Sequence, residues 1–175
     1  SLYKFDVKKI FISLLFFLFF TSQSYACSLL TVSIGTPITT AENTLDFLRN
    51  YNAEIFGKKT VRYSTNAIDY CEGSSLENAD LEVLVYDSKV VGINVISSDS
   101  EIKNEIYEFV KNKIGDPGEE VKSDNWTGYK NLSIGSLIMV YSKIDIRGEM
   151  FEFLEITNSE MMDYTSSDEI IDMMG

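Results

Sequence analysis

The chain of 175 residues contains no histidine, two cysteines, two prolines and one tryptophan. The absence of histidine excludes Ser-His-Asp and Cys-His catalysis and the usual histidine-containing zinc sites. Two cysteines cannot supply the four thiolates of a structural zinc site. The phosphate-binding patterns GxxxxGK and GxGxxG are also absent. We therefore expect no cofactor and no metal centre of these types, and the sequence favours a protein without catalytic activity.

Basic residues are scarce as well. Lysine and arginine number 15 against 27 aspartates and glutamates, which gives a formal net charge of −12. The first 26 residues hold three lysines and one aspartate, so the remainder carries a formal charge of −14. Such a surface repels nucleic acid and anionic headgroups, because phosphate binding needs clustered lysine and arginine. We expect neither nucleic acid nor a membrane surface as partner, and a protein partner would tend to be basic.

The N-terminus has the layout of a secretory signal. Three lysines precede an apolar run over residues 10–20, and Ser24 and Ala26 stand at the −3 and −1 positions of a cleavage site before Cys27. The apolar run is too short for a membrane-spanning helix, which needs about 20 residues. The sequence therefore predicts a signal peptide over residues 1–26, a mature chain over 27–175, and export to the periplasm or the medium.

Cys27 has two competing interpretations. A bacterial lipoprotein carries its lipid on a cysteine in this position, but its signal prefers leucine three places earlier, where this chain has Ser24, and the bulky Tyr25 follows. The alternative is a disulfide with Cys71, which an oxidising compartment would form. We favour the disulfide and keep lipidation as the alternative.

Two helices are expected from apolar spacing and end signals. The first covers residues 40–56, with a capping box at Thr39 and Glu42 and an end at Gly57. The second covers residues 99–114, where a stripe of apolar residues recurs at intervals of three and four. Its capping box is Ser98 and Glu101, Gly115 is expected in the left-handed position after the helix, and Pro117 prevents continuation.

Strands are expected after each helix. Residues 81–86 and 89–96 flank Asp87-Ser88 as one hairpin, and residues 136–146 and 149–157 flank Arg147-Gly148 as another. Shorter strands are expected at 60–64 and 125–130. The chain from 27 to 175 is thus predicted to be a single α+β domain with two helices packed on an antiparallel sheet. The halves look alike, which indicates either tandem α-β-β units or the same few residue types at unrelated strand ends and caps.

One stretch resembles a known family. The sequence KNKIGDP at 111–117, followed by Trp126 and Tyr129 and then LIMVYSK at 137–143, is similar to two related groups. These are the small outer-membrane assembly lipoproteins of the SmpA type and the secreted beta-lactamase-inhibitor protein. The resemblance covers about residues 111–156 and departs from the family in the first half, which has no tryptophan. It implies an envelope or secreted protein that works by binding other proteins.

Candidate binding residues follow from the aromatic and acidic positions. Trp126, Tyr129 and Tyr141 are candidate partner-binding anchors, with burial in the core as the alternative. A glycine-containing loop carries four acidic residues as a candidate calcium site or a solvated loop: Asp116, Glu119, Glu120 and Asp124. From about residue 160 the tail is acidic and holds four of the six methionines, which suit either a partner or its own domain.

These observations favour a non-catalytic exported protein that binds another protein, such as an inhibitor, an immunity factor or an envelope assembly factor. The alternative is a small hydrolase that acts through paired carboxylates, or a protein that binds a small ligand or calcium.

Overall fold

The structure is a computed structural model that describes residues 27, 34–49, 53–56, 60–97 and 104–165. The expected signal peptide lies outside these residues. Within them, no helix combines the length and the apolar character that a membrane span requires.

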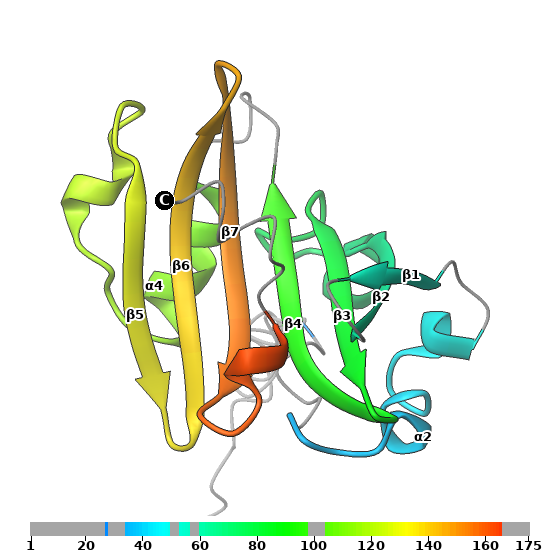
Figure 1. The fold of residues 1–175 in the computed structure, drawn as a ribbon. Coiled ribbons are helices and arrows are strands. Elements are labelled where there is room, and N and C mark those ends of the chain that lie inside the picture. Colours follow the sequence, from blue (N-terminus) through cyan, green and yellow to red (C-terminus); the bar gives the residue numbers. More distant parts are fainter. Residues whose placement is uncertain (1–26, 28–33, 50–52, 57–59, 98–103, 166–175) are drawn as a thin grey trace, which may run out of the picture.

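Seven strands form one antiparallel sheet in the order β1-β2-β3-β4-β7-β6-β5 (Figure 1). β4 and β7, the last strands of the two halves, pair at the centre. The strands are β1 (Ala53–Phe56), β2 (Thr60–Asn66), β3 (Asp80–Tyr86), β4 (Lys89–Ser97), β5 (Gly128–Ile134), β6 (Leu137–Ile146) and β7 (Glu149–Asn158).

The described helices are short. They are α2 (Ile38–Ala41), α3 (Ile68–Cys71) and α4 (Glu105–Lys113), with 3₁₀ turns η2 (Asp46–Arg49), η3 (Glu119–Lys122) and η4 (Met162–Tyr164). The α+β class is therefore confirmed in its coarse form, with sheet as the dominant element. In Figure 1, α4 lies behind the sheet and η4 lies in front of it.

Both expected hairpins are confirmed. Asp87 and Ser88 take positive φ values of 47° and 60° between β3 and β4, and Arg147 and Gly148 take 59° and 88° between β6 and β7. Such mirror-image turns match the twist of the strands they join. The strand expected at 60–64 is β2, which extends to Asn66. The strand expected at 125–130 begins later, at Gly128, and forms a third, unexpected hairpin with β6.

The helix expected over 40–56 is wrong. This stretch holds the end of α2, the turn η2 and the strand β1, and Pro37 precedes α2 without a side-chain cap from Thr39. The backbone of Ile55 pairs with Val61 in β2, so pairing along the sheet edge replaces helical hydrogen bonds in this part of the chain. Tertiary pairing overrides a weak local pattern here.

The second helix is present but its ends differ from the expectation. The described helix α4 begins at Glu105, and the expected capping box at Ser98 and Glu101 lies outside the described residues. Gly115 does not adopt a left-handed conformation, since its φ is outside the positive range. The backbone N–H groups of Ile114 and Gly115 both donate to the carbonyl of Val110. The helix therefore ends without the expected glycine cap.

Side-chain alternation gives the sheet a covered face and an open face. Leu81 and Val83 in β3 face the same way as Ile93 in β4 and Leu154 in β7, and all are fully buried with Ile106 and Val110 of α4 in one core cluster. We call this side the covered face. The opposite side, which carries the alternate residues of each strand, is called the open face.

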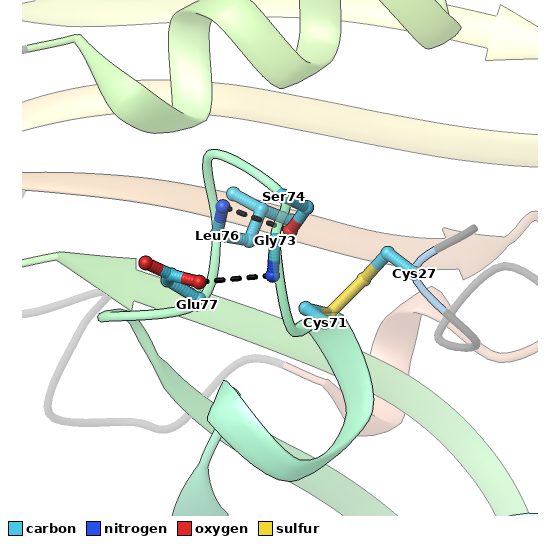
Figure 2. The surroundings of a disulfide bond; sticks show 6 residues. All are labelled: Cys27, Cys71, Gly73, Ser74, Leu76 and Glu77. Atoms are coloured by element: carbon cyan, nitrogen blue, oxygen red, sulfur yellow. Dashed lines mark hydrogen bonds between the residues drawn. A yellow bond between two sulfur atoms is a disulfide. The ribbon is translucent and has the colours of Figure 1, made fainter. Parts of the chain in front are cut away.

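Cys27 and Cys71 form the predicted disulfide (Figure 2). Cys71 ends α3, and both cysteines are buried in the core cluster. The turn after α3 is held by hydrogen bonds from Gly73 N–H to Glu77 Oε2 and from Leu76 N–H to Ser74 Oγ. The bond therefore ties the start of the predicted mature chain to the core beside β2 and β3.

Candidate functional site

The three predicted aromatic anchors do not form one surface. Tyr141 is fully buried on the covered face, which corrects its assignment as a partner-binding residue. Trp126 is half-buried and stacks on Tyr141, with ring centroids 6.4 Å apart. Tyr129 is 65% exposed and faces the other way, because it pairs with Ser142 rather than Tyr141 across β5 and β6. Of the three, Tyr129 is the residue that is open to a partner.

The acidic loop is neutralised by lysines. Glu119 Oε1 accepts a hydrogen bond from Lys111 Nζ at 2.6 Å, and Lys111 also lies 3.7 Å from Asp116 Oδ2. Lys111 lowers the pKa of the Glu119 carboxyl, and Glu119 in turn raises the pKa of Lys111. The buried ring of Tyr107 lies beneath this group, with Lys122 Nζ 4.9 Å from its centroid.

Glu120 has a lysine partner of its own. Lys130 Nζ donates to Glu120 Oε1 at 2.6 Å and lowers the pKa of that carboxyl. Asp124 is exposed on the same loop. Nowhere in the described part of the chain do three or more acidic, cysteine or histidine side chains gather as a metal-binding group. The four predicted cation ligands are therefore not brought together.

A buried carboxylate connects α4 to the sheet. Glu152 in β7 is 5% exposed. Its carboxylate accepts hydrogen bonds from the backbone N–H groups of Tyr107 at 2.7 Å and of Ile106 at 3.3 Å. The hydroxyl of Tyr141 donates to the same carboxylate at 2.8 Å. The first N–H groups of a helix have no partner within the helix. Glu152 supplies that partner from a strand and places negative charge at the positive end of α4.

Lys143 is buried beside this carboxylate. It stands opposite Glu152 in the β6–β7 register and is 5% exposed. Its Nζ donates to Asn104 Oδ1 and to the carbonyl of Val121, each at 2.6 Å. Asn104 is the residue before α4 and takes a left-handed φ of 69°. Lys143 therefore fixes both the start of α4 and the turn η3 onto β6.

Burial raises the pKa of the Glu152 carboxyl, while the hydroxyl of Tyr141, the two amides and the charge of Lys143 oppose that rise. Burial and the neighbouring Glu152 raise the pKa of Tyr141. All the hydrogen-bond capacity described for Glu152 is directed at the protein itself. We therefore interpret this network as structural. No local sequence signal marked it, because it depends on the register of β6 against β7.

The open face carries an aromatic row. Ile96 in β4 pairs with Phe153 in β7, which pairs with Ser142 in β6, which pairs with Tyr129 in β5. Phe153 stacks with Phe151 at a centroid distance of 6.1 Å. Other half-buried apolar residues of the same face are Ile138, Val140 and Ile144. We call the set formed by Ile96, Tyr129, Val140, Phe151 and Phe153 the apolar row.

A polar row crosses the other half of this face. Arg62 Nη1 lies 3.5 Å from Glu82 Oε1, and Asn94 Nδ2 donates to Glu82 Oε2 at 3.3 Å. Asn94 pairs with Glu155 across β4 and β7, and its Oδ1 atom is buried without a hydrogen-bond donor. Glu155 is half-buried, and this burial raises the pKa of its carboxyl. A neutral Glu155 would be a hydrogen-bond donor beside the Asn94 acceptor.

One described segment crosses the open face. Residues 159–165, which we call the strap, leave β7 through a turn in which Asn158 Oδ1 accepts the N–H groups of Glu160 and Met161 at 3.0 Å each. The strap includes η4 and ends at Thr165, which is 1% exposed. In Figure 1, η4 lies in front of the sheet, beside β7 and β4.

Comparison of the chain with protein-family models, with curated proteins and with solved structures finds no match.

The Glu152 network generates a stability prediction. Glu152→Ala leaves the Tyr141 hydroxyl and two helix amides without their acceptor and removes the negative charge beside the buried Lys143. We therefore expect a loss of about 3–5 kcal/mol in the free energy of unfolding. Tyr141→Phe removes one donor to the carboxylate and should cost about 1.5–3 kcal/mol. The measurement is urea denaturation. Glu149→Ala, an exposed change in the same strand, is the control and should stay within about 0.5 kcal/mol. Equal values for Glu152→Ala and the control would contradict the network.

Glu155 generates a pH prediction. Its pKa is raised in the folded state, so the folded chain binds this proton more tightly than the unfolded chain. Its stabilising contribution is therefore complete below the unfolded pKa of about 4.3 and is lost as pH rises through the folded pKa. Glu155→Gln keeps an acceptor for Thr165 but cannot ionise. We expect the stability of the wild type relative to this variant to fall as pH rises above about 4.3, measured by urea denaturation. A constant difference between the two proteins would contradict the assignment.

Proposed function

We propose that this chain is an exported, non-catalytic protein that binds another protein through the open face of its sheet. The observation that carries the proposal is the apolar row, in which aromatic side chains from β7 and β5 lie in register on the face opposite α4. Apolar surface that is grouped on one face of a domain marks interaction sites more often than scattered apolar residues do.

The residue types of the apolar row suit an interface. Phenylalanine and tyrosine supply large buried area at low entropic cost, and aromatic residues are enriched at the centres of protein interfaces. Tyr129 in the edge strand β5 is 65% exposed on the open face. Phe151 and Phe153 lie further towards the middle of the sheet, in β7. A partner seated on this face would cover both groups.

Charge favours a basic partner. The formal net charge of −14 over residues 27–175 creates a negative field around the mature chain, and complementary charge speeds the encounter of two proteins. Several acidic side chains of the covered side are already paired with lysines, as in the loop after α4. The excess of acidic residues elsewhere therefore provides the attraction.

Export is supported by the signal-like N-terminus and by the disulfide. A disulfide forms and persists in an oxidising compartment, and Cys27 cannot carry a thioether-linked lipid while its sulfur is bonded to Cys71. We place the protein in the periplasm or the medium, with residues 1–26 as the signal peptide.

The strand order supports a tandem arrangement as a finer proposal. The meander β2-β3-β4 and the meander β5-β6-β7 each run in chain order, and they meet through their last strands, β4 and β7. This is the arrangement that two similar units related by a two-fold axis would give. It agrees with the proposed resemblance to the SmpA-type and beta-lactamase-inhibitor proteins, which bind other proteins.

The hydrolase and calcium alternatives find little support among the described carboxylates. Glu152 is committed to hydrogen bonds inside the protein, and Glu119 and Glu120 are paired with lysines. The apolar row offers a more specific surface for binding, so we favour a protein partner.

The test is capture of a partner by matched variants. Mature chains 27–175 are immobilised and exposed to an envelope extract of the producing cells, and bound proteins are quantified by mass spectrometry. Phe153→Asp and Tyr129→Ala change the apolar row, whereas Ile68→Asp changes an exposed apolar residue of α3 that is 49% exposed. We expect a partner that the wild type and Ile68→Asp retain and that Phe153→Asp loses by tenfold or more, about 1.4 kcal/mol.

Unfolding curves of each variant exclude a folding defect as the cause of lost binding. A protein that binds all variants equally, or no bound protein at all, would contradict binding through the open face. The intact mass of the wild type should correspond to a chain that begins at Cys27 and is two hydrogens lighter than its dithiol form.

A further inference from the structure

The strap occupies a site built for it on the open face. Gly92 lies in the middle of β4, where a glycine weakens a strand and often marks the close approach of another segment. A Cβ atom at Gly92 would lie 2.6 Å from Thr165 Cγ2, which is too close for two carbon atoms. The methyl group of Thr165 therefore fills the space that the absent side chain of Gly92 leaves.

Polar contacts hold Thr165 at this position. Its hydroxyl lies 3.0 Å from Glu155 Oε1 and 2.9 Å from the carbonyl oxygen of Met162. Rotation of the side chain to relieve a clash at Gly92 would move the hydroxyl away from these partners. Leu84, which pairs with Gly92 on the same face, is fully buried.

Two contacts extend the strap across the first half of the sheet. The ring of Tyr164 stacks on Tyr86 of β3, with centroids 4.2 Å apart and planes 18° apart. The hydroxyl of Thr60 in β2 donates to the carbonyl of Tyr164 at 2.9 Å. The strap thus contacts β2, β3, β4 and β7, all from the open face.

The strap is nevertheless held by few contacts. Its regular structure is a single 3₁₀ turn of three residues, Met162 is 46% exposed and Tyr164 is 37% exposed. A segment with exposed apolar side chains and few buried contacts opens at a lower free energy than the sheet beneath it. Its contacts are also of the kind that a peptide from another protein would make, namely one aromatic stack, one small side chain against a glycine, and one hydrogen bond from a side chain of the sheet to a main-chain carbonyl.

We propose that the strap is an internal ligand of the open face, which covers the Tyr86–Gly92–Glu155 surface in the free protein and must be displaced before a partner can occupy that surface. This inference rests on the proposed function and adds its regulation. The partner segment that fits the uncovered surface presents an aromatic side chain beside a small hydroxyl residue, as Tyr164 and Thr165 do. Only the fraction of protein with an uncovered surface can bind the partner. The apparent Kd is therefore the intrinsic Kd divided by that fraction.

The test introduces a steric clash between β4 and the strap and then removes it with a second substitution. Gly92→Ala places a methyl group against Thr165 and should open the strap. Thr165→Ser removes the Cγ2 atom and keeps the hydroxyl, so the double variant Gly92→Ala/Thr165→Ser should close it again. Thr165→Ser alone is the matched control. The readouts are hydrogen exchange of residues 159–165 by mass spectrometry and fluorescence of the apolar dye 1-anilinonaphthalene-8-sulfonate, both with the full mature chain.

We expect exchange in the strap to be roughly tenfold faster in Gly92→Ala, the scale of effect expected of an overpacked contact. Dye fluorescence should rise, exchange in β6 and β7 should stay unchanged, and the double variant should return to wild-type values. Unchanged strap exchange in Gly92→Ala would overturn the proposal. Equal acceleration of the strap and of the central strands would also overturn it, because the strap would then be an inseparable part of the folded core.

Partner capture separates this inference from the proposed function. Gly92→Ala should retain more of the partner than the wild type, and the double variant should not. If the strap opens and the partner binds all these variants equally, the competition is wrong and the proposed function stands. If no variant captures a partner through the open face, the proposed function fails, and the exchange and dye results alone decide whether the strap is a releasable cover.

Discussion

The buried carboxylate of Glu152 is the interaction on which the arrangement of the molecule depends. It places one strand residue against the N-terminal amides of α4 and against the hydroxyl of Tyr141. Lys143 beside it reaches Asn104 and the carbonyl of Val121. Buried charged groups are tolerated when they are fully hydrogen-bonded. Removal of one partner leaves the other group buried without compensation, which lowers the free energy of unfolding. The network therefore fixes which face of the sheet α4 covers.

Once α4 is fixed on one face, the two sides of the sheet differ in kind. The covered face holds the core cluster and joins it to the disulfide between Cys27 and Cys71. The open face keeps half-buried aromatic residues in β7 and an exposed Tyr129 in β5. The strap lies over the half of this face formed by the earlier strands. The sheet is covered on one side by α4, and on the other side its apolar and polar side chains lie in separate rows. Such a surface is suited to binding a second protein.

The hairpins could be predicted from the sequence, because two-residue turns such as Asp87-Ser88 separate strands of clear alternation. The disulfide followed from there being only two cysteines. The helix expected over 40–56 failed because β1 gains its hydrogen bonds from β2, which no local pattern reports. For Tyr141, the sequence left partner binding and burial in the core as alternatives, and its burial follows from the register of β6 with β7. Alternation along β6 places Tyr141 and Lys143 on one face, but the pairing of Lys143 with Glu152 and the hydrogen bond from Tyr141 to Glu152 are tertiary features.

The most direct test of the central claim is native-state hydrogen exchange at the amides of Ile106 and Tyr107, followed by NMR. Amides in the first turn of a helix normally exchange quickly, since they lack partners within the helix. If Glu152 accepts these two protons inside the fold, both amides will exchange only through global unfolding, with the same free energy as the central strands β4 and β7. Fast exchange through local opening of the first turn of α4 would contradict the account.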